Sequence, residues 1–378
     1  MAARRDDVIL ARKLTYLRTV KNFIFLILCS VHVATSAQKV IPFVDFNFYF
    51  RTFENDNFRQ LEFQQIKEYK AGDDLVAYID TRGNLRVYDG NERQDISNMN
   101  VQYQVSDHLL AYNIGPTLNI WDGGKLRTLT YFASDYVVKD SMVVFKDTRF
   151  NTVNVYWNKQ IIELYRMTGD LAMPEAIGDN ILAFKDNGNF FKVFWRGQVY
   201  DLGVWNNSIE FQAGCDILCF NDPTTRTFAV FENGNFLDVE SFYMKKYKAG
   251  RGMIVYEDLN GNLNVYRSGM KEMLSNFSAS FWEVKDDMVV WGENSFVYAF
   301  QRGQKVQVSN YTPKLYLIKN NVMAFRNQLG GVSALVNGKV HDLTSQQDAE
   351  FEIFGDAVLV KMFNRSYIVF KDGRIFTA

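Results

Sequence analysis

The sequence predicts an all-β protein built from repeated four-stranded antiparallel units, and three observations predict it. A unit of about 35 residues recurs along most of the 378-residue chain, which marks a solenoid, a propeller or an array. Apolar residues alternate within each unit, as in Phe191, Val193 and Trp195, and this is the period of a β-strand. Gly, Asn and Asp separate the apolar runs, and these residues suit tight hairpin turns.

The unit is clearest in residues 178–202, GDNILAFKDNGNFFKVFWRGQVYDL. Its second strand ends on an aromatic residue, and this anchor recurs at Tyr78, Tyr112, Phe145, Phe184, Phe220, Tyr256, Trp291 and Phe325. Four antiparallel strands at this period describe one blade of a β-propeller, whose radial closure protects the sheet edges. Nine copies can be recognised and the last is weak, so we predict a single large propeller of 8–9 blades.

The N-terminal residues 1–37 have the pattern of a secretory signal peptide. Basic residues precede a short apolar run, Phe23 to Leu28, and small residues follow it. The run is about half of the roughly 20 residues that a membrane-spanning helix needs. We expect cleavage between Ala37 and Gln38. An uncleaved membrane anchor is the alternative.

Residues 38–65 form the second predicted segment, and the propeller repeats occupy residues 66–378. The stretch from Phe46 to Phe63 precedes the first full copy and holds about two strands. We expect this strand pair to join the C-terminal copy and close the ring, the alternative being an independent hairpin on one face. No Pro-rich or Ser-rich linker interrupts the array, which indicates one mature domain.

Composition restricts the possible partners. Aromatic residues make up 15% of the chain, which favours strands and argues against disorder. Removal of residues 1–37 would leave a net charge of about −5, without a basic stripe. Because binding to phosphate backbones needs clustered Lys and Arg, we expect no nucleic-acid partner.

Two cysteines, Cys215 and Cys219, follow the predicted signal. Cys219 takes the place of the small residue Ala that other copies carry. If Cys215 and Asp216 form the turn before it, Cys219 faces Gln212 across the hairpin. We therefore expect two free thiols, although an exported protein could pair them.

The histidines and acids do not form a recognisable catalytic or metal motif. His108 and His341 fall in different parts of the repeat and in distant units. No GxSxG motif indicates a nucleophile, and catalytic zinc usually needs two or three histidines. We expect no catalytic residue, no metal ligand and no cofactor.

Aspartate recurs at the end of the second strand, at Asp80, Asp147, Asp186, Asp222 and Asp258. We interpret these residues as turn-starting aspartates, which bond the backbone two residues later. Asp258 to Asn262 faintly resembles a calcium loop, but the further ligands are absent. A second set, Asp95, Glu163, Asp201, Asp238 and Asp342, is expected on solvated outer strands.

Segments that depart from the repeat are the best places to look for a partner surface. The main departures are residues 166–175, 204–208 and 222–226, and all are short. Trp121, Trp157, Trp195 and Trp291 occupy repeat positions and should pack between blades. Trp205 breaks the pattern and is the best exposed candidate. We expect partner contacts at Trp205, Asn206, Asn207, Met173 and Pro174.

The repeat, with residues 178–202 as its clearest form, resembles exported bacterial β-propeller repeat proteins. The signal ending ATSA-QK resembles that of proteins exported by Gram-negative bacteria. In overall character the chain is similar to the plug subunit of the type IX secretion translocon in the outer membrane. The resemblance implies a non-catalytic periplasmic interaction module that closes the periplasmic mouth of a large pore. The alternative is a glycan- or peptide-acting propeller enzyme or lectin with its site at the ring centre.

Overall fold

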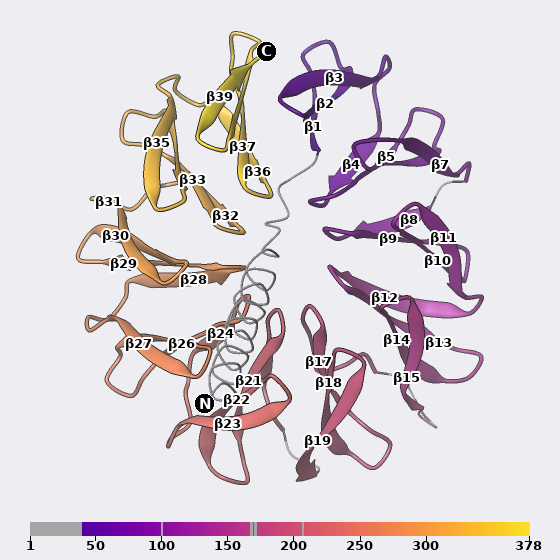
Figure 1. Ribbon diagram of the computed structural model, residues 1–378, viewed down its shortest axis with the longest axis vertical. Coiled ribbons are helices and arrows are strands. Elements are labelled where there is room, and N and C mark those ends of the chain that lie inside the picture. The colour runs from indigo at the N-terminus through magenta and orange to yellow at the C-terminus, as the bar shows by residue number, and fades with distance from the viewer. Residues whose placement is uncertain (1–39, 100, 167–168, 170–171, 206–207) are drawn as a thin grey trace, which may run out of the picture. The chain divides into compact units, whose positions relative to one another are not determined.

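The computed structural model describes residues 40–378, apart from residues 100, 167–168, 170–171 and 206–207. These residues form ten antiparallel sheets arranged in a ring (Figure 1), one with three strands and nine with four. We number the sheets as blades 1 to 10 in chain order. The predicted propeller of four-stranded blades is confirmed, but the predicted 8–9 blades are wrong because the N-terminal segment adds a tenth. The predicted signal and its cleavage site lie outside the described residues.

The strands of blades 1 to 5 are β1 (Ile41–Val44), β2 (Phe50–Glu54), β3 (Asn57–Glu62), β4 (Glu68–Ala71), β5 (Val76–Ile79), β6 (Leu85–Tyr88), β7 (Arg93–Ser97), β8 (Gln102–Val105), β9 (Leu109–Ile114), β10 (Thr117–Asp122), β11 (Lys125–Thr130), β12 (Ala133–Lys139), β13 (Met142–Asp147), β14 (Thr152–Trp157), β15 (Gln160–Arg166), β16 (Ala176–Ile177), β17 (Ile181–Lys185), β18 (Phe190–Trp195) and β19 (Gln198–Trp205).

The strands of blades 6 to 10 are β20 (Phe211–Ala213), β21 (Ile217–Asp222), β22 (Thr227–Glu232), β23 (Asn235–Glu240), β24 (Tyr247–Ala249), β25 (Ile254–Glu257), β26 (Leu263–Arg267), β27 (Met270–Ser275), β28 (Phe281–Lys285), β29 (Met288–Glu293), β30 (Phe296–Gln301), β31 (Gln304–Ser309), β32 (Tyr316–Lys319), β33 (Val322–Arg326), β34 (Val332–Val336), β35 (Lys339–Thr344), β36 (Glu350–Phe354), β37 (Ala357–Lys361), β38 (Tyr367–Lys371) and β39 (Arg374–Thr377).

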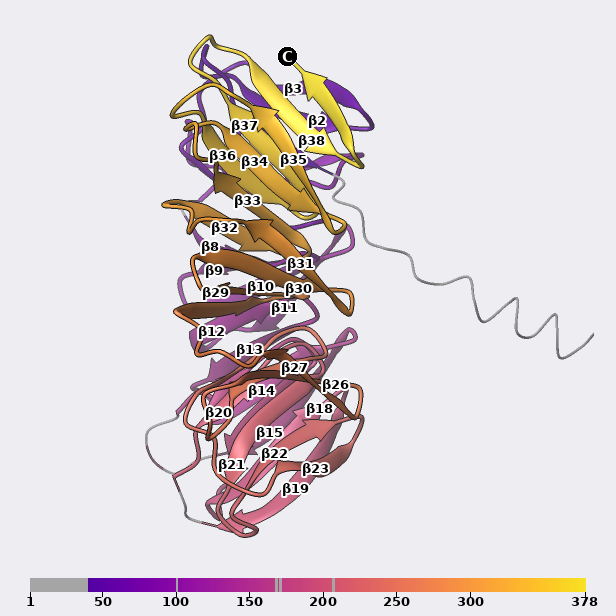
Figure 2. The ribbon, with the colours of Figure 1, turned by 90° about the vertical axis from the view of Figure 1, so that its left-hand side faces the viewer.

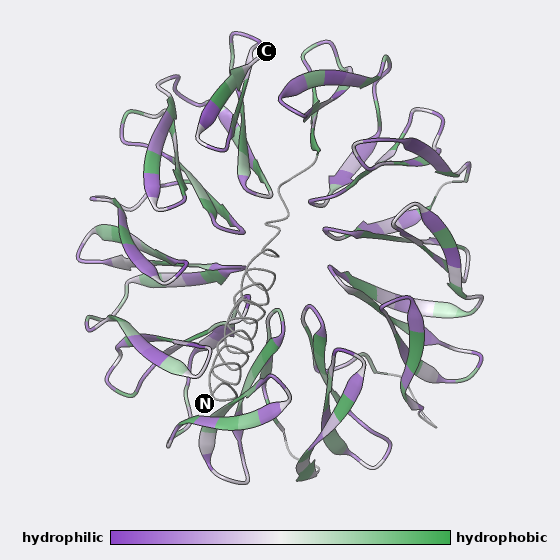
Figure 3. Ribbon diagram, viewed as in Figure 1, coloured by the Kyte–Doolittle hydropathy of each residue, from purple (hydrophilic) through white to green (hydrophobic). Residues whose placement is uncertain are grey.

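The core lies between neighbouring blades. The second strand of a blade is buried on both sides, as in β5 and β17, because each face of a sheet covers the next sheet. Figure 3 shows hydrophobic stretches along the strands and hydrophilic turns between them. Trp291 of blade 8 is fully buried in a cluster with Val255 and Leu263 of blade 7. Trp121, Trp157 and Trp195 also pack between blades, as predicted.

Blade 1 corresponds to the second, third and fourth strands of a standard blade. The Asp45 carboxylate accepts hydrogen bonds from the backbone N–H groups of Asn47 and Tyr49. The Asp80 carboxylate does the same with Arg82 and Asn84. This shared turn identifies β1 and β2 as the counterparts of β5 and β6. Strands β1 to β3 form a sheet of their own, so the expected pairing of Phe46–Phe63 with the last repeat is wrong.

The ring closes by side-chain packing between blades 1 and 10. The rings of Phe43 and Tyr367 lie 4.6 Å apart, and those of Phe53 and Phe376 lie 4.9 Å apart. The Tyr367 hydroxyl donates to the Val44 carbonyl at 3.2 Å.

No helix long and apolar enough to span a bilayer occurs in the described part of the chain.

Candidate functional site

The antiparallel order of strands divides the connections of each blade between two ends. The turns that join the first strand to the second, and the third to the fourth, lie at one end of a sheet. The second-to-third turns and the links between blades lie at the other end, which we call the loop face. In the side view the sheets share one tier (Figure 2), so each end forms a continuous face of the ring.

The first-to-second turns of blades 2 to 9 meet in a hydrogen-bonded chain, which we call the belt. The backbone N–H of Asp74 donates to the Asp107 carbonyl at 2.9 Å. The N–H of Asp107 donates to the Asp140 carboxylate at 3.1 Å, and the N–H of Asp140 donates to the Asp179 carboxylate at 2.9 Å. Each turn is thus bonded to the turn of the next blade.

The belt continues through blades 6 to 9 and returns to blade 2. The Arg251 N–H donates to the Asp286 carbonyl at 2.7 Å, and the Asn320 N–H donates to the Asp286 carboxylate at 2.9 Å. The Asn320 amide then donates to the Asp73 carboxylate at 3.3 Å, and Lys319 Nζ lies 3.6 Å from Asp73 Oδ1. Blades 10 and 1 separate blades 9 and 2 along the ring (Figure 1), so this contact closes the belt across them.

Glycine permits the close approach of neighbouring turns. A Cβ on Gly72 would lie 1.9 Å from the Ser106 carbonyl oxygen, and one on Gly214 would lie 1.9 Å from that of Gly250. Such distances are far inside van der Waals contact, so only glycine fits. The recurrence of AGD, IGD, AGC and AGR before the turn was visible in the sequence. Its role in the belt could not be inferred from the repeat alone.

The belt places several carboxylates in a confined and poorly hydrated position. Burial, with the charges of Asp140 and Asp73, raises the pKa of Asp107 to about 7. Burial also raises the pKa of Asp73, and the Lys319 charge opposes that rise. Burial raises the pKa of Asp179 as well. The Asp107 carboxyl can therefore hold a proton near neutral pH.

A central cavity of about 480 Å³ lies beside the belt. Asp107, Asp140, Asp179 and Asp286 line it with Lys319, and apolar groups such as Leu317 and Ile353 complete it. Lys139 and Lys285 also line it, so the cavity carries charges of both signs. In the described part of the chain, no three His, Cys, Asp or Glu side chains are placed to hold a metal ion.

The two histidines among the described residues lie apart. His108 Nδ1 lies 2.6 Å from Asp74 Oδ2, at the edge of the belt. His341 lies on β35 and packs against the Phe370 ring at 4.8 Å. The structure does not bring them together.

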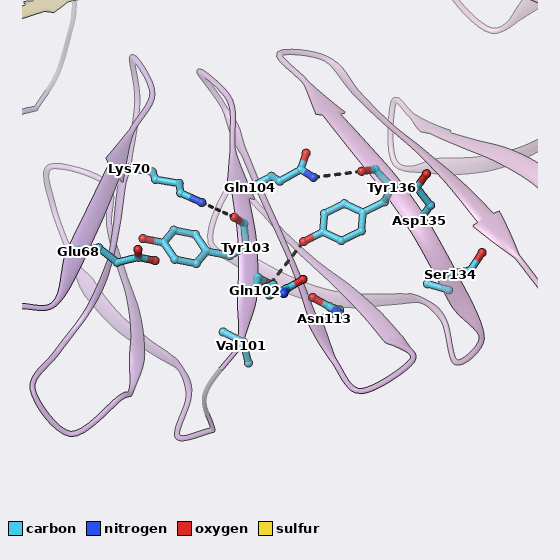
Figure 4. Close-up of a pocket in the computed structure, with 11 residues that line it drawn as sticks. Glu68, Lys70, Val101, Gln102, Tyr103, Gln104, Asn113, Ser134, Asp135 and Tyr136 are labelled. Atoms are coloured by element: carbon cyan, nitrogen blue, oxygen red, sulfur yellow. Dashed lines mark hydrogen bonds between the residues drawn. The ribbon is translucent and has the colours of Figure 1, made fainter. Parts of the chain in front are cut away.

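A second cavity, of about 460 Å³, lies on the inner wall between blades 2, 3 and 4 (Figure 4). Lys70 Nζ donates to the Tyr103 carbonyl at 2.8 Å and lies 4.4 Å from its ring centre. The Gln104 amide pairs with the inner edge of β12: it donates to the Tyr136 carbonyl and accepts from the Val138 N–H, both at 3.1 Å. These polar groups join neighbouring blades.

The recurrent aspartates start turns, as predicted. The Asp258 carboxylate accepts hydrogen bonds from the N–H groups of Asn260 and Asn262 at 2.8 and 2.9 Å. Asp80, Asp147, Asp186 and Asp222 accept equivalent bonds. The second acidic set, Asp95, Glu163, Asp201, Asp238 and Asp342, is exposed on outer strands.

The cysteines also follow the predicted geometry. Cys219 lies opposite Gln212 in the pairing of β20 and β21, and it is fully buried. Cys215 occupies the turn, and both thiols are free. Burial and the neighbouring carboxylates raise the pKa of Cys215 to about 12, so it stays protonated at neutral pH.

Large apolar side chains project from the loop face. In the second-to-third turns and their edges these are Phe48, Phe150, Phe190, Leu259, Leu329 and Phe363. In the links between blades they are Phe63, Met99, Tyr131, Trp205, Phe242 and Phe277. The third-to-fourth turns at the opposite end are polar pairs such as Asn233–Gly234, Arg302–Gly303 and Asp372–Gly373.

Three of the five predicted partner contacts, Trp205, Met173 and Pro174, are described by the structure and lie on or near this face. Trp205 is 58% exposed and its indole N–H donates to the Gly188 carbonyl at 2.9 Å. Pro174 is buried, and Met173 is half-buried against the cluster between blades 4 and 5. Asn206 and Asn207 lie outside the described residues. The sequence indicated Trp205 by its break in the repeat, but it did not indicate the other projecting side chains.

Ten blades in one ring are also what the family comparison finds: the model of the 10-bladed beta propeller domain matches residues 34–376. The chain belongs to this family. No curated protein matches it. Membership in the ten-bladed family defines the architecture and leaves the function open.

Several solved structures are similar to this chain at low identity. The computationally designed Ika8 protein is 16% identical, with a TM-score of 0.34, over 73% of this chain and 94% of its own. Citrobacter koseri AztD is 10% identical, with a TM-score of 0.34, over 80% and 93%. The CRINKLY WD40 ectodomain of the Arabidopsis thaliana receptor kinase ACR4 is 7% identical, with a TM-score of 0.30, over 71% and 93%.

Proposed function

We propose that this ten-bladed propeller is a non-catalytic interaction module of the periplasm. In this proposal it docks on the periplasmic side of an outer-membrane assembly, as an accessory or plug subunit of a protein translocon. The predicted export signal in residues 1–37 and the resemblance to periplasmic propellers support the location.

The observation that carries the proposal is the belt. Its carboxylates accept backbone N–H groups of neighbouring blades, so they are occupied in holding the ring together. The contact of Asn320 and Lys319 with Asp73 draws blades 9 and 2 together. These hydrogen bonds join the turns of neighbouring blades around the centre of the ring. Such a ring suits a subunit that obstructs a pore, and it suits less well an enzyme that admits a substrate along the ring axis.

The test is purification of the tagged protein in mild detergent, followed by identification of what accompanies it. Copurification of an outer-membrane β-barrel protein is the expected result. A monomeric product without a partner, from cells grown and lysed under several conditions, contradicts the proposal. A control with an exported propeller of another family identifies proteins that adhere to any propeller.

The central cavity favours a second candidate, a glycan- or peptide-acting protein. Asp107, with its pKa raised to about 7, faces that cavity beside Asp140, and a carboxyl that titrates near neutral pH can act as a general acid or base. Hydrolysis or binding of glycans or peptides that disappears in Asp107→Asn, with the fold intact, is the outcome that favours this candidate.

A further inference from the structure

The loop face combines a layer of projecting aromatic and aliphatic side chains with exposed basic ones. Phe63 and Leu329 are 76% exposed, and Phe363 is 70% exposed. Soluble proteins seldom expose so many large apolar groups on one face without a partner. These side chains are not part of the core between the blades, so they are available for contact with a partner.

The exposed apolar side chains occur in small sets, one set to each turn or link, and each set stands at the tip of a loop. The Arg149 guanidinium lies 5.4 Å from the centre of the Phe132 ring and 5.2 Å from that of Phe150. Phe190 and Trp205 are paired across β18 and β19. The tips are thus distributed from blade to blade. A protein interface would need a contiguous apolar core with a polar rim, whereas separate tips can each enter the interfacial layer of a bilayer.

The loops carry charges of both signs, and exposed acids on the links between blades include Glu175, Glu210 and Asp348. The aspartates that start the turns accept backbone N–H groups at the base of each loop, as Asp147 and Asp258 do. Exposed basic side chains stand among the projecting apolar ones, at Lys67, Arg82, Arg149, Lys245, Lys314 and Arg365. Aromatic rings flanked by Lys and Arg are typical of surfaces that lie on anionic lipid.

We infer that the loop face binds the surface of a phospholipid bilayer that carries anionic headgroups. The aromatic tips enter the headgroup layer, and the basic side chains pair with lipid phosphates. The inference rests on the proposed function only for its location, because a subunit docked at the outer membrane would turn this face toward lipid. The opposite end of the ring, which carries the belt and the polar third-to-fourth turns, then faces away from the bilayer.

The test is sedimentation of the full chain with vesicles of phosphatidylglycerol or of phosphatidylcholine. We expect stronger binding to the phosphatidylglycerol vesicles and a decrease with added salt. The loop-face variant combines Phe150→Ser, Phe242→Ser and Phe363→Ser, which replace side chains that are 55%, 61% and 70% exposed. Its binding should fall at least about tenfold, since each aromatic group lost from the interface removes buried apolar area.

A matched control variant carries Ile161→Ser, Met270→Ser and Ile375→Ser, which replace side chains that are 47%, 72% and 51% exposed away from the loop face. It should bind as the unmodified chain does. Equal binding by the loop-face and control variants overturns the inference, because the loop-face aromatic side chains then contribute nothing to binding. Equal binding to both kinds of vesicle overturns it as well.

Two outcomes distinguish this inference from the proposed function. In the first outcome a membrane protein copurifies with the unmodified chain but not with the loop-face variant, and the unmodified chain does not bind vesicles. The face then binds protein, and the lipid inference fails. If vesicles bind through the loop face and no partner copurifies, the proposed translocon role fails and the lipid inference stands. Circular dichroism of each variant confirms that the exposed substitutions leave the fold intact.

Discussion

The side-chain amide of Asn320 in blade 9 donates a hydrogen bond of 3.3 Å to the carboxylate of Asp73 in blade 2. The two residues are 247 positions apart in the chain, and two blades lie between theirs along the ring (Figure 1). Asp73 is only 5% exposed, and Lys319 is its nearby cation. The bond makes the belt a closed loop, so the stability of the ring depends on contacts at its centre as well as between blade faces.

Removal of this contact should destabilise the whole propeller. Asp73→Ala leaves Asn320 and Lys319 without their acceptor at the belt, and we expect a loss of about 1–3 kcal/mol in the free energy of unfolding. Chemical denaturation followed by tryptophan fluorescence measures it. Arg365→Ala, at an exposed loop position, should change stability by less than about 0.5 kcal/mol. If the two variants denature together, the belt has no energetic role.

The glycines of the belt should not tolerate a side chain. In Gly214→Ala the new Cβ meets the Gly250 carbonyl oxygen at 1.9 Å, so the turns of blades 6 and 7 must separate. We expect a loss of about 1–3 kcal/mol or more, as for other overpacked sites. Gly169→Ala is the matched control, because its Cβ would meet open space among the described residues. Thermal melting of both variants checks the prediction, and a Gly214→Ala protein as stable as the control contradicts it.

The repeat and its period were sufficient to predict the blades, since strand alternation and turn residues are local signals. They were insufficient for blade 1, because Phe46–Phe63 lacks the full unit and its identity appears only in the Asp45 turn. The belt was hidden for a different reason. The bond between Asn320 and Asp73 depends on the curvature of the whole ring, which no local pattern encodes. The loop face was visible only once topology had placed its turns at the same end.

The belt carboxyls should make stability depend on pH. Burial and the charges of Asp140 and Asp73 raise the pKa of Asp107 from its usual value of 3.8 to about 7 in the folded chain. The folded state then binds more protons than the unfolded state between these values, so stability is highest below about pH 4 for this group and declines toward pH 7. Asp107→Asn imitates the protonated form and should flatten that decline. Melting temperatures of both proteins between pH 4 and 8 measure the difference. Parallel curves for the two proteins would show that Asp107 titrates normally.

Blade 1 should be essential to the ring, because it covers blade 2 on one side and blade 10 on the other. Phe50 is fully buried, and its ring centre lies 4.9 Å from that of Tyr78 and 5.4 Å from that of Tyr69. Phe50→Ala should therefore lower the free energy of unfolding by about 3–5 kcal/mol. Phe48→Ala, in the same blade but 60% exposed, should cost less than about 0.5 kcal/mol. Deletion of Phe46–Phe63 removes β2 and β3, and it should lower the melting temperature of the whole chain in one transition. Unchanged melting of the deletion variant would mean that blade 1 is an appendage rather than a member of the ring.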